Sequence, residues 1–284
     1  MSLYAVIGDP ISHSKSPLIH SDFAAETGED IKYVAHKVSS ENFDDFVNEF
    51  FEKGGSGLNV TLPHKQRACK IAKHLDSVSK SAEAANTLYL NGDGEICAAN
   101  TDGPGLIADI KLNKNTQIKG KDLLLLGAGG AIRGALISLI DEEPASITIA
   151  NRTVSKAEAL KQKFDKVLKI KASSYQNLEG DFDLIINGTS TGLIDDVPAL
   201  RASNLRKGSF CYDMYYSSSD TAFVRWAKAN GAAHVFDGLG MLVEQAAESF
   251  FLWRGVRPNT EEIIKKLAGL WILFFAKIKK GHFN

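Results

Sequence analysis

A lysine and an aspartate are the residues of this chain whose chemistry best suits proton transfer. Lys65 ends the run Asn59-Val-Thr-Leu-Pro-His-Lys65, and Asp102 lies within Asn100-Thr-Asp-Gly103. A lysine beside a carboxylate can give a proton to an oxyanion forming on a carbonyl, or take one from an alcohol in the reverse direction. Taken singly, Lys65 also fits a solvated helix residue and Asp102 a turn residue. The two predict acid–base chemistry if the fold brings them together.

Four more polar residues are expected near this pair because they also flank predicted strands. Ser14 and Ser16 follow the first strand, Thr61 ends the third, and Asn86 precedes a predicted hairpin. Loops after parallel strands open on one edge of a sheet, where α/β proteins bind ligands. A small polyhydroxylated acid needs such partners, because each buried hydroxyl left unpaired costs about 1 to 3 kcal/mol. The set predicts a substrate of that kind.

A glycine-rich turn predicts a second site, for a dinucleotide. Four leucines, Leu123 to Leu126, are typical of a strand buried on both faces, and Gly127, Gly129 and Gly130 follow. Gly127 and Gly129 allow a tight turn, so that backbone N–H groups can approach a diphosphate where a helix begins near Gly130. The spacing is GxGGxxxG, not the stricter GxGxxG, and such turns also occur for purely geometric reasons. The turn alone therefore supports cofactor binding only weakly.

The loop about twenty residues further along is where a Rossmann fold distinguishes its two nicotinamide cofactors. After a predicted strand at 146–150 the chain carries Asn151, Arg152, Thr153 and Lys156. An acidic residue here would accept hydrogen bonds from the 2′-hydroxyl of NAD, whereas Arg and Lys suit a 2′-phosphate. An exposed basic loop that caps the next helix would have the same composition. We expect NADP as the cofactor.

Composition excludes several classes of partner. The chain has 284 residues, with 33 Lys plus Arg against 34 Asp plus Glu, and a net charge of −1 does not indicate nucleic acid or an anionic membrane. Three widely spaced cysteines, Cys69, Cys97 and Cys211, fit a reducing cytoplasm and no metal site. The N-terminus lacks the pattern of a signal peptide. The apolar run 269–276 is too short to span a bilayer and is expected to be a packed helix end or a subunit contact, in a monomer or homodimer.

Strands and helices alternate along the chain, which predicts an α/β fold of two domains. We expect residues 1–112 to form a substrate domain with a mainly parallel sheet, 113–238 a Rossmann domain, and 239–284 helices that pack back toward the first domain. A helix is expected to start at Ser16, as N-cap, and to end at Gly28. Further helices are expected at 105–112 and 241–253, and strands at 3–8, 32–38, 57–62, 87–90, 95–99, 167–171, 183–187, 209–213 and 233–236.

The chain resembles the shikimate dehydrogenase family from Tyr4 to about Leu267. Nine motifs occur in the family's order, which makes the resemblance specific. They are Ser12-His-Ser-Lys-Ser-Pro17, Asn59-Val-Thr-Leu-Pro-His-Lys65, Asn86-Thr87, Asn100-Thr-Asp-Gly103, Gly127-Ala-Gly-Gly130, Asn151-Arg-Thr153, Asn187-Gly-Thr-Ser190, Tyr212-Asp-Met-Tyr215 and Asp237-Gly-Leu-Gly-Met-Leu-Val-Glu-Gln245.

The resemblance implies reversible reduction of 3-dehydroshikimate to shikimate by NADPH, a step of aromatic amino-acid biosynthesis, with Lys65 and Asp102 handling the proton. It also implies the binding roles of the remaining residues. Ser14, Ser16 and Tyr215 would hold the substrate carboxylate; Thr61, Asn86, Asp102 and Gln245 the ring or its hydroxyls; Gly127, Ala128, Gly129, Gly130 and Ala131 the diphosphate; Asn151, Arg152, Thr153 and Lys156 the 2′-phosphate; and Thr189, Met214 and Gly238 the nicotinamide half.

Three departures from the family's pattern concern the backbone. Glu83 and Ala98 stand where glycine is usual, and Ala222 stands where proline is usual. Other functions also fit parts of the pattern: a quinate/shikimate dehydrogenase of broader specificity, a catalytically silent NADP or metabolite sensor, and methylenetetrahydrofolate dehydrogenase. The basic loop at 151–156 disfavours the broader quinate/shikimate dehydrogenase. Intact Lys65 and Asp102 disfavour a silent sensor. The two-serine loop disfavours methylenetetrahydrofolate dehydrogenase.

Overall fold

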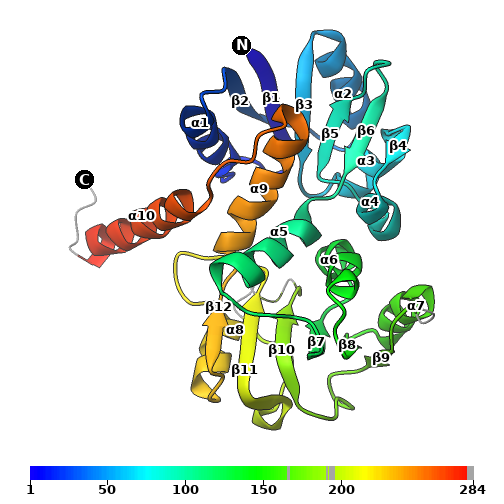
Figure 1. Cartoon of the computed structure of the whole chain (residues 1–284), viewed down its shortest axis with the longest axis vertical. Helices are drawn as coiled ribbons and strands as arrows, with labels where there is room; N and C mark the ends of the chain where they lie inside the picture. Colours follow the sequence, from blue (N-terminus) through cyan, green and yellow to red (C-terminus); the bar gives the residue numbers. More distant parts are fainter. Residues whose placement is uncertain (165–166, 190, 192–195, 280–284) are drawn as a thin grey trace. The chain divides into compact units, whose positions relative to one another are not determined.

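The computed structural model describes residues 1–164, 167–189, 191 and 196–279, except for the side chains of 271–279. The chain forms two compact units, Met1–Gly105 with Leu242–Ile263, and Leu106–Met241 with the residues from Ile264 onward. Each unit contains one six-stranded sheet (Figure 1). The predicted fold class, α/β with two sheets, is confirmed. The functional domain ranges 1–112, 113–238 and 239–284 stay a prediction.

The first unit has a mixed sheet in the order β2-β1-β3-β5-β6-β4. β1 runs parallel to β2 and β3, whereas β5 is antiparallel to β3 and β6, and β4 is parallel to β6. The predicted hairpin is confirmed, because β5 and β6 pair through the turn that follows Leu90. The strands are β1 (Ser2–Gly8), β2 (Ile31–Lys37), β3 (Gly55–Val60), β4 (His74–Leu75), β5 (Thr87–Leu90) and β6 (Ile96–Ala99).

Helices α1 to α4 belong to the first unit, together with most of α9. Helix α1 begins at Ser16 itself, because Lys15 occupies the N-cap position and no side chain caps the helix, so the predicted N-cap is wrong by one residue. Gly28 ends α1 in the left-handed region at φ +71°, as expected. The helices are α1 (Ser16–Thr27), α2 (Phe43–Glu52), α3 (Lys65–Ile71), α4 (Ser77–Ala82) and α9 (Leu239–Arg254).

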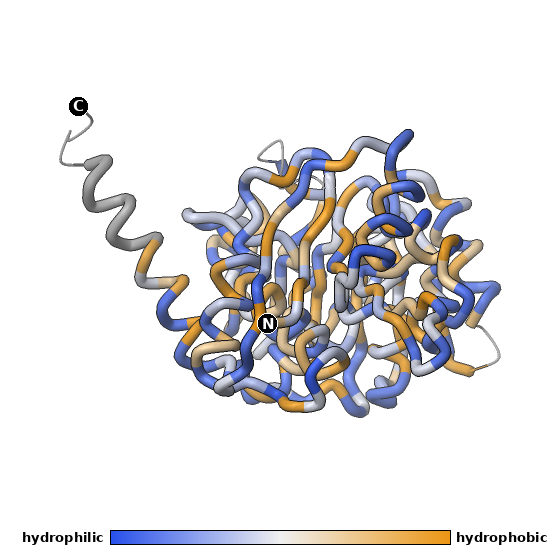
Figure 2. Tube along the Cα trace, turned by 90° about the horizontal axis from the view of Figure 1, so that it is seen from above, coloured by the Kyte–Doolittle hydropathy of each residue, from blue (hydrophilic) through white to orange (hydrophobic). Residues whose placement is uncertain are grey.

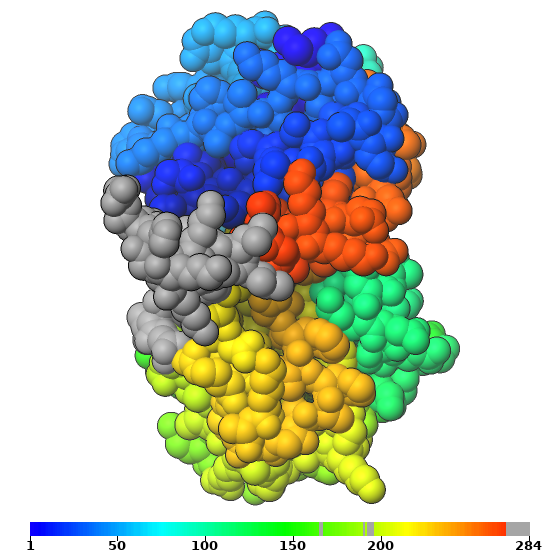
Figure 3. Space-filling model, turned by 90° about the vertical axis from the view of Figure 1, so that its left-hand side faces the viewer, coloured from blue at the N-terminus to red at the C-terminus, as the bar shows by residue number. Residues whose placement is uncertain are grey.

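The segment after α9 returns to the N-terminal residues of the first unit. Arg254 Nε lies 2.6 Å from Glu29 Oε2, and the backbone N–H of Asn259 donates to Glu26 at 3.1 Å. Figure 3 shows this segment in orange-red against the blue N-terminal part of the chain. Trp253 also donates from Nε1 to the carbonyl of Leu88, at 3.3 Å. These contacts fix the end of α9 on the sheet of the first unit.

The second unit has an all-parallel sheet in the order β12-β11-β10-β7-β8-β9. Counted from β7, this is the Rossmann order 3-2-1-4-5-6, with the reversal of strand order between β7 and β10. The strands are β7 (Asp122–Leu126), β8 (Ser146–Ala150), β9 (Ile170–Ser173), β10 (Phe182–Asn187), β11 (Leu205–Asp213) and β12 (His234–Phe236).

The predicted strand at 167–171 is found later in the chain, at Ile170–Ser173. The backbone N–H groups of Val167 and Leu168 donate to the carbonyl of Phe164, at 2.9 and 3.3 Å, and so continue the turn at the end of α7. Because of these local hydrogen bonds, the strand begins three residues later in the chain than predicted. The predicted helix at 105–112 is found as two elements, α5 (Asp102–Ala108) and the π-helix η1 (Asp109–Asn113).

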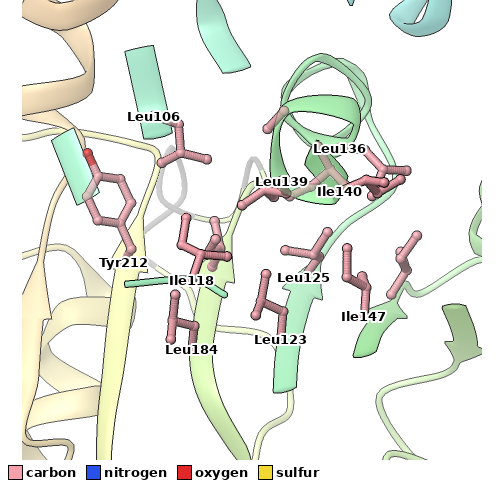
Figure 4. Close-up of a cluster of buried hydrophobic side chains, with 14 of the residues drawn as sticks. Leu106, Ile118, Leu123, Leu125, Leu136, Leu139, Ile140, Ile147, Leu184 and Tyr212 are labelled. Atoms are coloured by element: carbon pink, nitrogen blue, oxygen red, sulfur yellow. The ribbon is translucent and has the colours of Figure 1, made fainter. Parts of the chain in front are cut away.

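The core of the second unit lies between the sheet and the helices that cover it. Leu123, Leu125 and Leu184 from the strands meet Leu136 and Leu139 from α6 (Figure 4). In the view of Figure 2, hydrophobic and hydrophilic stretches alternate along the chain, and hydrophilic residues occupy many of the outer turns. The remaining helical elements are α6 (Gly130–Asp141), α7 (Val154–Phe164), η3 (Ala202–Asn204), α8 (Ala222–Ala229) and α10 (Glu261–Lys279).

No helix in the described part of the chain is long and apolar enough to cross a membrane. The apolar run at 269–276 belongs to α10. Of this run, the side chain of Leu270 is described and is 45% exposed, whereas those of residues 271–276 lie outside the described side chains, so the predicted contacts stay a prediction.

Candidate active site

Lys65 and Asp102 meet in the first unit. Lys65 is the first residue of α3 and Asp102 the first residue of α5, so each follows the end of a strand by a few residues. Lys65 Nζ donates to Asp102 Oδ2 at 2.6 Å, and the two side chains are 28% and 11% exposed. The geometry provides an ammonium group held by a carboxylate and still reachable from solvent. A lysine and a carboxylate positioned in this way can carry out proton transfer.

The backbone around Lys65 is fixed on both sides. The N–H of His64 donates to the carbonyl of Thr61 at 2.9 Å, and the carbonyl of Lys65 accepts from Ala85 at 2.8 Å. His64 is buried, and its Nε2 lies 2.7 Å from the carbonyl oxygen of Val38. His64 therefore anchors the start of α3.

Asn86 connects Asp102 to helix α9. Its Nδ2 lies 3.0 Å from Asp102 Oδ1 and 3.3 Å from Gln245 Oε1, and its Oδ1 accepts from the backbone N–H of Thr101 at 2.9 Å. Asn86 is only 2% exposed. Because Asp102 receives Lys65 on one oxygen and Asn86 on the other, the carboxylate has a single orientation.

Gln245 joins this group although a glutamine on an apolar helix gives no chemical signal in the sequence. Helix α9 approaches very closely at this point, since a Cβ at Gly105 would lie 2.6 Å from the backbone nitrogen of Gln245. Its Nε2 donates to the carbonyl of Leu242 at 2.8 Å, which leaves Oε1 directed to Asn86. The glycine three residues after Asp102 is the one sequence feature that could have indicated the contact.

The two serines and Thr61 lie at neighbouring strand ends of the first unit. Ser14 Oγ accepts from the backbone N–H of Ser16 at 3.3 Å, and both serines are half-buried. Thr61 pairs through its backbone N–H with the carbonyl of Ile7 at 2.9 Å. Gly8 makes room for it, because a Cβ there would lie 2.4 Å from Thr61 Cγ2. The serines and Thr61 thus lie in loops that follow the neighbouring parallel strands β1 and β3, at the same edge of the sheet.

The glycine turn of the second unit sits at the reversal of strand order. Gly127 has φ +99° and donates to the carbonyl of Ala150 at 2.8 Å, so its conformation requires glycine. Gly129, the N-cap of α6, has a φ of −85°, which any residue can adopt, so its own backbone conformation does not require glycine. A Cβ at Gly129 or Gly130 would meet nothing within 4 Å. Open space therefore lies in front of the N-terminus of α6, with Ala128 and Ala131 on either side.

The basic loop lies beside this turn because β7 and β8 are paired up to Leu126 and Ala150. Asn151 donates from Nδ2 to the carbonyl of Thr153 at 2.8 Å, which closes the loop on itself. Arg152, Thr153 and Lys156 are exposed. Arg152 and Lys156 thus follow the end of β8, which is paired with the strand that leads to the N-terminus of α6. This is where the sequence predicts the binding of a 2′-phosphate.

Asp213 organises the loops that carry Thr189 and Tyr215, and sequence reasoning gave it no role. Its Oδ1 accepts from Asn187 Nδ2 and from the backbone N–H of Tyr215, both at 3.1 Å, and Oδ2 accepts from Thr221 Oγ1 at 2.6 Å. Asn187 in turn accepts from Thr189 Oγ1 at 2.6 Å. Asp213 is fully buried, and burial raises its pKa to about 6.

Met214 and Gly238 complete this part of the second unit. The N–H of Met214 donates to the carbonyl of Asn187 at 2.8 Å, and a Cβ at Gly238 would lie 2.3 Å from the carbonyl oxygen of Met214. Gly238 is thus required by the close approach of two loops. Ser190, the last residue of the Asn187 motif, lies outside the described residues. Among those that are described, no cluster of His, Cys, Asp and Glu could hold a metal ion.

Three segments of the chain match families of known proteins. Residues 6–88 match the family described as "Shikimate dehydrogenase substrate binding domain". Residues 106–206 match "Shikimate / quinate 5-dehydrogenase", and residues 238–268 match "Shikimate 5'-dehydrogenase C-terminal domain". The first match covers Lys65 and Asn86, and the second covers the glycine turn and the basic loop.

Individual relatives cover nearly the whole chain. A shikimate dehydrogenase (NADP(+)) of Hahella chejuensis is 52% identical over 270 residues, which is 95% of this chain and 98% of the relative. The crystal structure of an Ael1 enzyme from Pseudomonas putida has a TM-score of 0.90 and 44% identity, covering 94% of this chain and 98% of that one. A shikimate 5-dehydrogenase from Thermus thermophilus, in complex with NADP(H) and shikimate, has a TM-score of 0.83 and 28% identity, covering 95% and 100%.

Proposed function

The chain belongs to the shikimate dehydrogenase family, and from that premise we propose that it catalyses the NADP-dependent, reversible interconversion of shikimate and 3-dehydroshikimate. It is an oxidoreductase that acts on a CH–OH group. The observation that carries the proposal is the 2.6 Å contact between Lys65 Nζ and Asp102 Oδ2 at a partly open site. In the reducing direction the enzyme would serve the pathway to chorismate and the aromatic amino acids.

Lys65 is proposed as the proton donor and acceptor. In the oxidation of shikimate, Lys65 Nζ accepts the proton of the reacting hydroxyl; in the reduction, the ammonium group donates it to the oxygen of the carbonyl. Asp102 orients Nζ through its Oδ2 and balances the ammonium charge. Asn86 holds the other oxygen of Asp102 at 3.0 Å, so the carboxylate does not rotate during the proton transfer. NADP, when bound, supplies the chemistry of hydride exchange at the same carbon.

The first unit is proposed to bind shikimate by side chains that the fold has already oriented. Ser14 and Ser16 would hold the carboxylate, together with Tyr215. Thr61, Asn86 and Gln245 would contact the ring hydroxyls, in addition to Asp102. The contact between Asn86 and Gln245 supports this assignment, because a fixed pair of amides can distinguish hydroxyls by position.

The second unit is proposed to bind NADP, and its residues fit that cofactor. The space in front of α6, over Gly129 and Gly130, accommodates a diphosphate at the positive end of a helix. Arg152 and Lys156 are exposed cations at the neighbouring strand end, and a 2′-phosphate would pair with them. Asn151 and Thr153 would shape that loop. Thr189, Met214 and Gly238 would form the nicotinamide side.

A broader enzyme that also oxidises quinate is the second candidate. The match of residues 106–206 to a family described as "Shikimate / quinate 5-dehydrogenase" favours it. The exposed Arg152 and Lys156 favour the narrower enzyme, because no carboxylate of the 151–156 loop is available to a bare ribose hydroxyl.

The test is the initial rate of nicotinamide reduction with each donor and each cofactor. Shikimate and quinate are compared as donors, with NADP and NAD at equal concentration. We expect a fast rate with shikimate and NADP alone. Comparable rates with quinate or with NAD would identify the broader enzyme, and no rate with any pair would contradict the proposal.

A further inference from the structure

Tyr212 and Asp109 form a buried pair in the second unit to which neither the resemblance nor the proposed reaction assigns a role. Tyr212 lies near the end of β11, and Asp109 is the first residue of the π-helix η1. The Tyr212 hydroxyl donates to Asp109 Oδ2 at 2.6 Å, and neither side chain is exposed to solvent. A charge-assisted hydrogen bond in such surroundings is strong, because no water competes for either group.

The other oxygen of Asp109 is held by its own helical turn. Asn113 Nδ2 donates to Oδ1 at 2.9 Å, and Lys114 Nζ lies 3.5 Å from the same oxygen. Asn113 is the last residue of η1 and Lys114 follows it, so a single π-helical turn supplies both groups. Each carboxylate oxygen therefore has its own donor, and the orientation of Asp109 toward Tyr212 is fixed.

The oxygen of Tyr212 also caps the first turn of helix α9. Its one proton is given to Asp109, so the oxygen is left as an acceptor, and the backbone N–H of Met241 donates to it at 3.3 Å. Met241 is the third residue of α9, a position whose N–H has no acceptor within the helix. One phenol group therefore joins the end of β11 to the start of α9.

The residues just before Met241 are packed against the same part of the second unit. A Cβ at Gly240 would collide with the Asp109 carboxylate, so only glycine fits there. The backbone N–H of Gly238 donates to the carbonyl of Tyr215 at 3.2 Å. The segment 237–241 thus lies along the end of β11 and the loop that follows it.

We propose that Tyr212, held by Asp109, is a positioning residue for the nicotinamide half of the cofactor. This rests on the proposed function, in which Met214 and Gly238 belong to the nicotinamide side. Met214 follows Tyr212 by two residues, and Gly238 precedes Met241 by three. The contact between Tyr212 and Met241 therefore sets the separation of the two loops. The residues assigned to the phosphate groups follow β7 and β8, and they do not depend on this contact.

The first experiment removes only the phenol oxygen, in Tyr212→Phe. Titration calorimetry measures the Kd of NADP and that of adenosine 2′,5′-bisphosphate, which carries the 2′-phosphate but no nicotinamide. One lost hydrogen bond corresponds to about a threefold to tenfold change in affinity, so we expect the Kd of NADP to rise by that factor. The Kd of the bisphosphate should stay within about twofold. An unchanged Kd of NADP, or equal weakening of both compounds, would overturn the inference.

Ser209→Ala is the matched control for the loss of a buried hydroxyl. Ser209 lies on the same strand as Tyr212 and is equally buried, but its Oγ makes no hydrogen bond within the described part of the chain. Both dissociation constants should stay within about twofold in this variant. A rise in the Kd of NADP as large as that in Tyr212→Phe would overturn the inference, because any buried change in β11 would then have the same effect.

A double-mutant cycle tests whether Asp109 acts through Tyr212. Asp109→Asn and Arg152→Ala are each measured in the wild-type and Tyr212→Phe backgrounds, with the Kd of NADP as readout. We expect Asp109→Asn to cost at least about threefold less in the Tyr212→Phe background, whereas the cost of Arg152→Ala is unchanged. Equal costs of Asp109→Asn in both backgrounds would overturn the role of the pair. A wild type that binds neither compound would instead overturn the proposed function, so the two failures are distinguishable.

Discussion

The two units hold their proposed ligand groups in different ways. In the first unit the polar side chains hold one another: Asp102 is bound on both oxygens, by Lys65 and by Asn86, and Asn86 reaches Gln245. In the second unit the cofactor loop relies on backbone geometry and on exposed cations. Gly127 needs its positive φ, and Arg152 extends into solvent.

The difference follows from what each unit has to recognise. A small substrate with several hydroxyls is distinguished from its isomers by the direction of each hydrogen bond, so the partners must be oriented in advance. A dinucleotide offers strong charges over a large area, and backbone N–H groups with mobile Arg and Lys side chains suffice. Substitutions in the first unit should therefore affect the rate or substrate selectivity, and those in the cofactor loop the affinity for phosphate.

The largest effect is expected for Lys65→Ala, which removes the proposed proton donor from the oriented site. We expect kcat to fall by at least about a hundredfold, the scale that general acid–base catalysis supplies. Lys70→Ala is the control, because Lys70 lies on the same helix and is exposed. Steady-state kinetics in both directions measure the effect, and a similar loss in both variants would contradict the role of Lys65.

The next effect concerns Asp213, the buried charge of the second unit. Its pKa in the folded protein is raised to about 6, against an unperturbed value of about 4, so the folded state binds the proton more tightly than the unfolded chain. The contribution of the protonated Asp213 to the free energy of unfolding is fully present below pH 4 and is lost as the pH rises through 6. It amounts to about 3 kcal/mol.

The Asp213→Asn variant tests whether Asp213 makes the free energy of unfolding fall as the pH rises. Between pH 4 and pH 7 the free energy of unfolding of the wild type should fall relative to that of the variant by about 3 kcal/mol. Urea denaturation at several pH values measures the difference. Asp237, whose own pKa is raised mainly by burial, is the charged neighbour that raises the pKa of Asp213. Repeating the titration in an Asp237→Asn background is the control. A difference that does not depend on pH would mean that the pKa of Asp213 is the same in the folded and unfolded states, so that burial does not raise it.

A smaller effect is expected for Arg152→Ala in the exposed cofactor loop. Loss of one charged contact with a 2′-phosphate should weaken NADP binding by about tenfold and leave NAD binding within about twofold. Titration of each cofactor measures both constants. Lys161→Ala is the control, because it removes a partly exposed cation further along α7. If Arg152→Ala weakens the binding of NADP and NAD equally, the 2′-phosphate of NADP is not bound by Arg152.

The smallest effect is expected at Glu83, where the family's pattern has glycine. Glu83 ends α4 in the left-handed region, at φ +54°. Glu83→Gly should raise the free energy of unfolding by about 0.5 to 1 kcal/mol, because it relieves the clash of the Cβ in that conformation. Glu83→Ala, which keeps the Cβ, should give no gain. An equal gain in both variants would mean that the side chain and not the backbone causes the strain.

Site residues that are marked by their chemical type and by their position beside a predicted strand could be predicted from the sequence. Lys65 and Asp102 follow predicted strand ends and Asn86 precedes the predicted hairpin, so all three were expected at the sheet edge where α/β proteins bind ligands. A Rossmann domain was expected from the glycine turn and the alternation of strands and helices, and the observed strand order agrees with it. The left-handed conformation of Glu83 was indicated only as a departure from a glycine position.

Contacts made by residues with ordinary local roles could not be predicted. Gln245 reaches Asn86 because α9 approaches at Gly105, and apart from that glycine no local pattern indicates the approach. Asp213 resembles any acidic residue after a strand until its three donors are known. The strand predicted at 167–171 failed because the hydrogen bonds of Val167 and Leu168 extend a turn, a competition that periodicity does not reveal.

The dissociation constant of shikimate for the Lys65→Ala variant, compared with that of the wild type, tests the acid–base role most directly. If Lys65 transfers the proton while the other side chains hold the substrate, binding should weaken by less than about tenfold although turnover falls at least a hundredfold. If shikimate binding is lost in proportion to the rate, Lys65 is a binding residue and the proposed acid–base pair is wrong.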